Sequence, residues 1–324
     1  MADTVVPHSP EANAKGPRPA TGGWLKRALE SDVFYSFRRS RLTMVAAAVT
    51  ILFFVLAIFA PLLSVQNPFD PAQLQLINSR IPPLWTADGQ SPYLLGTDEQ
   101  GRDVLSAILY GLRLSLTVGV LGMLFSGVLG VLLGLVAGYV GGTVDNLIMR
   151  IADVQLTFPA VLIALLVNGV AKSVFGNKLD ATSMLLVLVL SIGLSFWVQY
   201  ARTVRGSVLV EKNKDYVAAA QLIGLPAPVI MLRHVLPNAM GPVLVIATIN
   251  LALAILTEAT LSFLGLGMPD TMPSLGTLIR IGNNYLFAGE WWIVAFPGIA
   301  LAVLILSINL LGDWLRDALN PKLR

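Results

Sequence analysis

Long runs without a charged residue divide the chain into apolar segments. Each run reaches about the 17–25 residues that a helix needs to cross a bilayer, and the two longest extend into flanking loops. The pattern therefore predicts an all-α integral membrane protein with six transmembrane helices. The six runs are Leu42–Phe69, Leu114–Val144, Val154–Ala171, Ala181–Ala201, His234–Thr257 and Trp291–Gly312.

Composition agrees with a chain that lies in lipid. Apolar residues make up 55% of it and charged residues only 13%, whereas soluble domains carry about 25% charged residues. The absence of cysteine excludes disulfides, thiol catalysis and cysteine-ligated metal sites. No phosphate-binding loop and no hydrolase or metalloprotease motif occurs, so we expect a non-catalytic protein with no cofactor and no metal of its own.

The distribution of Lys and Arg predicts the orientation. Six spans place both termini on one side. If that side is the cytoplasm, the inner segments carry sixteen Lys and Arg and the outer segments six. The excess predicts cytoplasmic N and C termini.

The segments around the spans divide the chain further. Residues 1–23 are predicted to be a disordered cytoplasmic tail, and residues 24–43 an interfacial amphipathic helix, with a simple flanking anchor as the alternative. The six-span domain covers 44–312. It includes an outer loop, 65–113, and an inner loop, 206–237, and a cytoplasmic tail follows at 313–324.

The outer loop contains a predicted helix start. Thr97 and Gln100 have the spacing of a capping box, Asp98 suits a helix N-terminus, and Arg102 lies four residues after it. The same stretch lies on the predicted outer side, where we expect an extracellular partner to dock. The role as a helix start and the role as a docking surface are compatible. The candidate docking or gating residues are Gly96, Thr97, Asp98, Gly101, Arg102, Asp103 and Glu258.

Glu258 falls near the outer end of the fifth predicted span. Two interpretations stay open: a boundary residue bonded to backbone or to a neighbouring helix, or a group on the transport pathway.

The inner loop "DYVAAAQLIGLPAPVIMLRHVLPNAMGP" is much longer than a simple connection between two spans requires. Asp215 to Ile223 is predicted to form a short helix with three clustered alanines, and Gly224 suits the left-handed position that ends it. Pro226 and Pro228 prevent its continuation. We therefore predict a compact helical knob whose thin surface fits a groove in another protein.

This loop resembles the coupling motif of bacterial ABC importer permeases: Glu-Ala-Ala, three residues, Gly, nine residues, Ile, one residue, Leu-Pro. Ala218 stands at the glutamate position and His234 at the isoleucine position, so the chain departs from the motif twice. The residues in this frame, with the helix start before it, are Asp215, Ala218, Ala219, Ala220, Gly224, His234, Leu236 and Pro237.

Further segments extend the resemblance over about residues 34–324. They include "LLGTDEQGRDVLSAILYGLRLSL", "AGYVGGTVDNLIMRIADVQLTFP", "LSFLGLGMPDTMPSLGTLI" and "WWIVAFPGIALAVLILSINLLGDWLRDALNPKLR". Together they are similar to the dipeptide/oligopeptide/nickel permease family, and within it to the C-type dipeptide permease subunits.

The resemblance implies a type I ABC importer permease in the bacterial cytoplasmic (inner) membrane. Implied partners are a sibling permease forming a heterodimer, two ATPase subunits that bind ATP and Mg, an extracytoplasmic solute-binding protein and a peptide substrate. No nucleic acid is implied. Nickel or another small solute is the alternative substrate, and a stand-alone secondary transporter, a channel or a non-transporting scaffold is the alternative function.

Overall fold

The protein is described by a computed structural model that covers residues 32–175 and 180–319. The predicted tail 1–23 lies outside these residues, as do residues 24–31 of the predicted interfacial helix. Within the described ranges every regular element is helical, and the one β-bridge joins Thr97 to Asp103. The all-α prediction is confirmed for this part of the chain.

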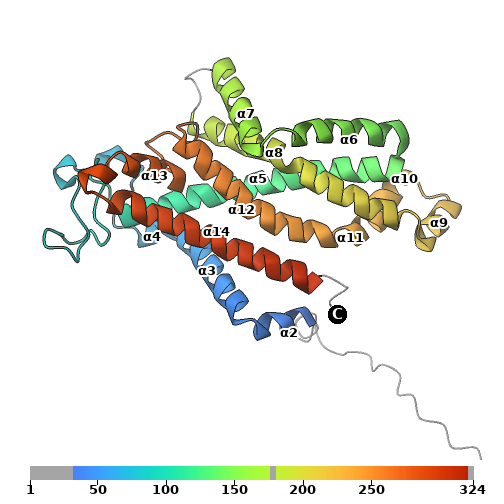
Figure 1. Ribbon diagram of the computed structural model, residues 1–324, viewed down its shortest axis with the longest axis horizontal. Coiled ribbons are helices and arrows are strands. Elements are labelled where there is room, and N and C mark those ends of the chain that lie inside the picture. The colour runs from blue at the N-terminus through green and yellow to red at the C-terminus, as the bar shows by residue number, and fades with distance from the viewer. Residues whose placement is uncertain (1–31, 176–179, 320–324) are drawn as a thin grey trace, which may run out of the picture.

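Five of the described helices are long and apolar enough to cross a membrane. They run side by side over much of their length, with α3 diverging from the others toward one end (Figure 1). A sixth span results if α6 and α7, which meet at a bend of 95°, count as one. The long helices are α3 Arg41–Ile58, α5 Val104–Val140, α8 Ala181–Glu211, α12 Gly241–Phe263 and α14 Trp292–Leu319; the bent pair is α6 Gly142–Leu156 and α7 Ala160–Phe175.

Several predicted boundaries differ from the structure. The first run yields a helix only to Ile58, followed by the short α4 Ala60–Leu63. The third run crosses the bend before Pro159, where the proline cannot continue the helical hydrogen bonding. Residues 313–319 continue α14 instead of forming a separate tail. Near the N-terminus, α2 covers Asp32–Arg39, and Ser40 caps α3 by accepting a hydrogen bond from the Thr43 N–H.

Glycines bring α5 and α8 into close contact. A Cβ added to Gly130 would lie 2.3 Å from the Trp197 carbonyl oxygen, and one added to Gly134 would lie 2.4 Å from that of Ala201. Because only a hydrogen fits in these gaps, the two backbones touch at successive turns, as in other small-residue helix contacts in membranes. Near the end of the pair, the Lys212 ammonium donates to the Gly138 carbonyl oxygen at 2.8 Å.

The bundle has two different ends. At the loop end, residues 64–103 and 264–291 lie together and contain three 3₁₀ turns and a short helix. At the opposite end, which we call the knob end, the chain between α8 and α12 projects from the bundle (Figure 1). The loop end holds η1 Pro71–Gln73, η2 Leu76–Asn78, α13 Leu275–Asn283 and η5 Leu286–Ala288; the knob end holds α9 Asp215–Leu222, α10 Ala227–Val229, the π-helical η4 Ile230–Val235 and α11 Leu236–Ala239.

Candidate functional site

The knob begins with the predicted short helix. α9 covers Asp215–Leu222, and Gly224 follows it with φ +78°. The Leu225 N–H donates to the Ala220 carbonyl oxygen at 3.2 Å, which closes the helix end in the manner of a Schellman turn. The prediction that Gly224 adopts a left-handed conformation is confirmed, and the open space around it leaves the backbone angle as the reason for glycine.

The three alanines of α9 do not share one surface. Ala218 and Ala219 are exposed, whereas Ala220 is buried beside Val217 against the inner part of the bundle. The expectation of one surface made by all three is therefore wrong. Helical spacing turns positions 217 and 220 inward and leaves 218 and 219 outside. Large apolar side chains extend the exposed face, because Leu222 is 89% exposed and Ile223 76% exposed.

The second half of the knob is a wide helical turn. In η4 the helix is π-helical, and the Leu236 N–H donates to the Met231 carbonyl oxygen, five residues earlier. The next residue is Pro237, which has no N–H and whose ring would clash with a carbonyl four residues back in an α-helix. His234 lies in this turn, and its Nδ1 is buried with no hydrogen-bond partner among the described residues.

A tyrosine joins the parts of the knob at its base. The Tyr216 hydroxyl donates to Glu211 Oε2 at 2.7 Å, at the end of α8, and accepts from Asn238 Nδ2 at 3.2 Å, in α11. Lys214 completes the group through a 2.6 Å ion pair with Glu211 Oε1. Burial and the hydrogen bond to Glu211 raise the pKa of Tyr216, so the hydroxyl keeps its proton at neutral pH.

Tyr216→Phe is expected to loosen the knob, because it removes both bonds of this hydroxyl. Each net hydrogen bond is worth about 1 kcal/mol, so the local opening free energy should fall by about 1–2 kcal/mol. Hydrogen–deuterium exchange over residues 211–238 measures the effect. Tyr285→Phe, at the loop end, is the matched control; equal exchange in the two variants would contradict the assignment.

The loop end contains the predicted pair of Asp98 and Arg102. The Arg102 Nε lies 2.5 Å from Asp98 Oδ2, and both side chains are almost fully buried. The pair does not lie on a helix, however, because Asp98 Oδ1 accepts from the N–H groups of Gln100 and Arg102, and Gly101 has φ +74°. The helix begins at Val104 instead, capped by Asp103, which accepts from the Ser106 N–H at 2.8 Å. The helix start predicted at Thr97 is therefore wrong.

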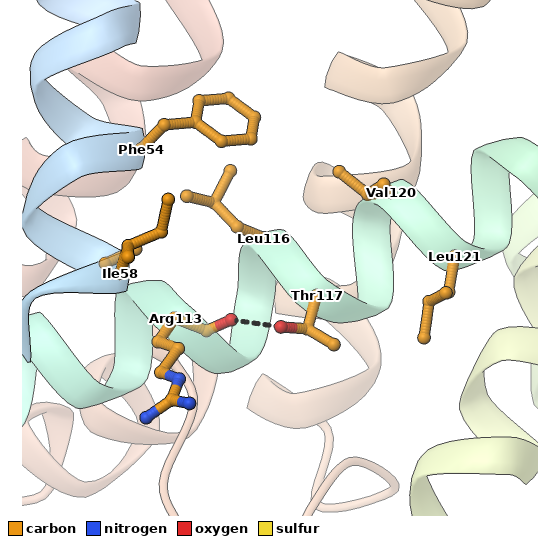
Figure 2. A pocket seen from close by; sticks show the side chains of 8 residues that line it. Phe54, Ile58, Arg113, Leu116, Thr117, Val120 and Leu121 are labelled. Atoms are coloured by element: carbon orange, nitrogen blue, oxygen red, sulfur yellow. Dashed lines mark hydrogen bonds between the residues drawn. The ribbon is translucent and has the colours of Figure 1, made fainter.

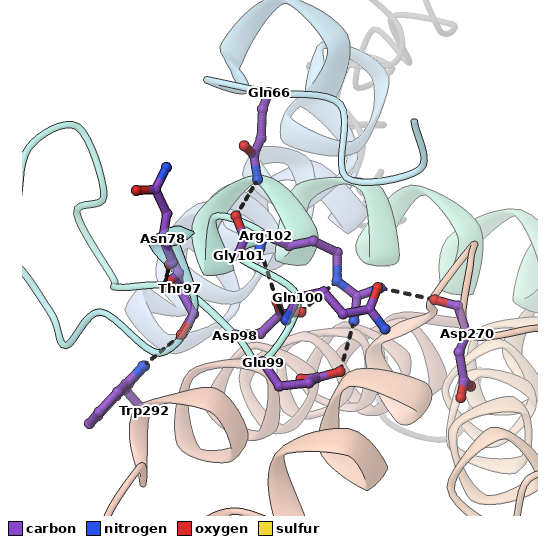
Figure 3. A network of polar contacts seen from close by, with 10 residues as sticks. All are labelled: Gln66, Asn78, Thr97, Asp98, Glu99, Gln100, Gly101, Arg102, Asp270 and Trp292. Atoms are coloured by element: carbon purple, nitrogen blue, oxygen red, sulfur yellow. Dashed lines mark hydrogen bonds and ion pairs between the residues drawn. The ribbon is translucent and has the colours of Figure 1, made fainter. Parts of the chain in front are cut away.

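Arg102 connects the two loops of this end (Figure 3). Its guanidinium donates to the backbone carbonyl of Asp270 at 2.9 Å, and its other terminal nitrogen lies 3.5 Å from Glu99. The Asp270 carboxylate in turn pairs with Arg280 of α13. Burial and the adjacent Asp98 carboxylate raise the pKa of Glu99.

Thr97 and Gly96 attach the first loop to its own earlier residues and to the start of α14. The Thr97 hydroxyl donates to the Asn78 carbonyl and accepts from the Ile81 N–H, and the Thr97 carbonyl accepts from Trp292 Nε1 at 3.1 Å. Gly96, with φ +82°, passes so close to Ile81 that a Cβ would lie 2.5 Å from its carbonyl oxygen. Six of the seven candidate residues at this end are therefore neighbours in one buried network: Gly96, Thr97, Asp98, Gly101, Arg102 and Asp103.

Glu258 lies apart from that network, fully buried in α12. Its two carboxylate oxygens accept from Ser115 of α5 and from Ser262, each at 2.7 Å. Ser115 also accepts from the Leu275 N–H at the start of α13, at 3.3 Å. This geometry corresponds to the expected contact with a neighbouring helix, and it ties three helices together.

Sequence reasoning missed several of these residues. Tyr216 and Asn238 are separated by 22 positions and have no motif in common. Helix α13 lies between the last two predicted spans, where no helix was predicted, yet Ser274 caps it and Leu275, Leu278 and Ile281 share its buried face. The cap and this spacing were readable signals of a helix.

Comparison with known proteins identifies the family. Residues 130–324 match the model "Binding-protein-dependent transport system inner membrane component", and residues 30–83 match "N-terminal TM domain of oligopeptide transport permease C". The structure is similar to a chain of the inward-facing MetNI methionine ABC transporter, with a TM-score of 0.52 and 18% identity, covering 66% of this chain and 96% of that one. That likeness shows a shared fold.

Curated relatives match over most of their length. The dipeptide transport system permease protein DppC of Escherichia coli K12 is 40% identical over 90% of this chain and 93% of its own. DppC of Haemophilus influenzae is 36% identical, covering 92% and 96%. The oligopeptide transport system permease protein OppC of Bacillus subtilis is 35% identical, covering 92% and 91%. The chain therefore belongs to the family of binding-protein-dependent transport system inner membrane components.

Proposed function

We propose that the chain is a permease subunit of an ATP-driven importer of dipeptides and oligopeptides. It forms the translocation pathway together with a sibling permease, and it hydrolyses nothing itself. Two separate ATPase subunits bind ATP and Mg, and a solute-binding protein delivers the peptide. The relatives named for dipeptide and oligopeptide transport support the substrate class.

The exposed face of the knob carries the proposal. Ala218 and Ala219 allow close approach, and the neighbouring Leu222 and Ile223 present exposed apolar side chains. Large exposed apolar side chains next to a thin helical surface are typical of a protein contact. In this proposal the knob docks in a groove of an ATPase subunit, so the knob end faces the cytoplasm and the loop end faces the solute-binding protein.

Single cysteines test the orientation, because the chain has none of its own. Cysteines at Ser91 and Thr271 are expected to react with a membrane-impermeant maleimide added to intact cells, and one at Asn213 is not. All three positions are exposed, so burial does not limit labelling. Labelling at Asn213 from outside would contradict the proposed orientation.

Uptake measurements test the function itself. Cells that carry the complete transporter are expected to accumulate a labelled dipeptide, and loss of ATP with the proton gradient kept should stop accumulation. Deleting this chain should abolish uptake while the binding protein still binds peptide. Uptake that survives ATP loss indicates a secondary transporter, and accumulation of nickel in place of peptide indicates the other substrate class.

A further inference from the structure

Arg113 is the only charged residue in the 37 residues of α5. It lies nine positions after Val104, about 14 Å along the helix from its loop-end start. Its side chain is exposed. No acidic group within the described parts of the chain pairs with its guanidinium, whereas Arg80, Arg102 and Arg280 of the same end all have carboxylate partners. A guanidinium that has no carboxylate partner in these parts of the chain can pair with an anion from outside the chain.

Two cavities meet at this side chain. The first, of about 340 Å³, is bounded by Phe54 and Ile58 of α3 and by Leu116 of α5; the guanidinium points away from Phe54 and Ile58 (Figure 2). The second, of about 320 Å³, reaches Phe69 in the first loop and Met272 in the second. Arg113 therefore lies next to the two loops, between α3 and α8.

An exposed stripe continues from Arg113 along α5. Its positions recur every three or four residues, so they share one helix face. Near the knob end the stripe borders a third cavity, of about 380 Å³, between α5 and α12. A cation thus stands at the loop end of a long apolar face. The stripe consists of Arg113, Thr117, Leu121, Leu124, Val128 and Leu132.

We propose that Arg113 binds the C-terminal carboxylate of the peptide as the peptide enters between the spans, with the apolar stripe beside the rest of it. The proposal rests on the function proposed above. A carboxylate is the one anion that every peptide carries whatever its side chains. A guanidinium binds it with two parallel charge-assisted hydrogen bonds, which a lysine does not reproduce.

Arg113→Gln tests the proposal in the complete transporter, with uptake of one peptide compared in its free-acid and C-terminally amidated forms. The effect of the variant is taken within each form, so any preference of the binding protein cancels. We expect uptake of the acid to fall about tenfold and uptake of the amide to fall less than about twofold. Arg113→Lys should retain more acid uptake than Arg113→Gln. Stimulation of ATP hydrolysis by loaded binding protein should persist.

Arg150→Gln is the charge-matched control, because it removes an exposed arginine from α6. It should leave both uptakes unchanged. Equal loss of acid and amide uptake in Arg113→Gln would overturn the proposal. Lost copurification of the sibling permease would then assign Arg113 to a subunit contact, and dependence on anionic lipid to a headgroup. Unchanged acid uptake would also overturn it. A wild-type transporter that imports no peptide is a different result, since it refutes the proposed function.

Discussion

Arg102→Ala is expected to lower the free energy of unfolding by about 3–5 kcal/mol, because it leaves the buried Asp98 carboxylate without its cation. Arg102 is completely buried, and its guanidinium also holds the backbone of Asp270 in the second loop. The variant removes both interactions at once. Thermal unfolding of the purified protein in detergent measures the loss.

Arg80→Ala is the matched control for this variant. Arg80 and Glu290 form a longer pair at 3.4 Å with the arginine side chain half exposed, so its loss should cost about 0–1 kcal/mol. The double variant Asp98→Asn/Arg102→Met should recover part of the stability, since the buried side chain of residue 98 is then no longer charged. Equal losses in Arg80→Ala and Arg102→Ala would show that the buried pair has no special role.

Ala219→Glu and Gly224→Val are expected to abolish peptide uptake while the chain still inserts and pairs with its sibling. Ala219 is exposed and a side chain at Gly224 meets nothing within the chain, so neither substitution creates a clash in the fold. Glutamate at 219 places a charge on the surface that we propose docks in the ATPase. Valine at 224 is strained by about 1–2 kcal/mol in the left-handed conformation and should distort the end of α9.

Uptake, ATPase copurification and stimulation of hydrolysis by loaded binding protein are the measurements. Asn213→Glu, which adds the same charge at an exposed position outside α9, is a suitable control and should be mild. The nearby Lys212 would be a poor control, because its ammonium donates to the Gly138 carbonyl oxygen near the end of α5. Wild-type uptake and stimulation in both knob variants would reduce the knob to a connector.

Local signals in the sequence were sufficient for much of the architecture. Charge-free runs located the long helices, because lipid leaves few ways to satisfy a backbone other than a helix. Gly224 and the adjacent prolines predicted where α9 ends, since those residues restrict the backbone by themselves.

Contacts between distant segments were beyond such signals. Thr97 and Gln100 have the spacing of a capping box, yet Thr97 bonds instead to Asn78 and Ile81, and α5 begins at Val104. The link from Arg102 to Asp270 spans 168 positions, and no local pattern encodes it. The bend between α6 and α7 was missed for a different reason: the spans were located by charge alone, and the break that Pro159 makes in the helix was not used.

The glycine contacts between α5 and α8 determine how force can pass through the molecule. Because their backbones touch at Gly130 and Gly134, the two helices should move as one rigid unit and should not slide past each other. The knob connects α8 of this pair to α12, and the segment that leads into α12 contains a π turn and a proline. A displacement of the knob should therefore rotate α12, while α5 and α8 keep their positions. Since α12 carries Glu258 at its far end, that rotation would strain the hydrogen bond that Glu258 accepts from Ser115 of α5, and it would reach the start of α13, where Gly276 packs against the Ala259 backbone of α12.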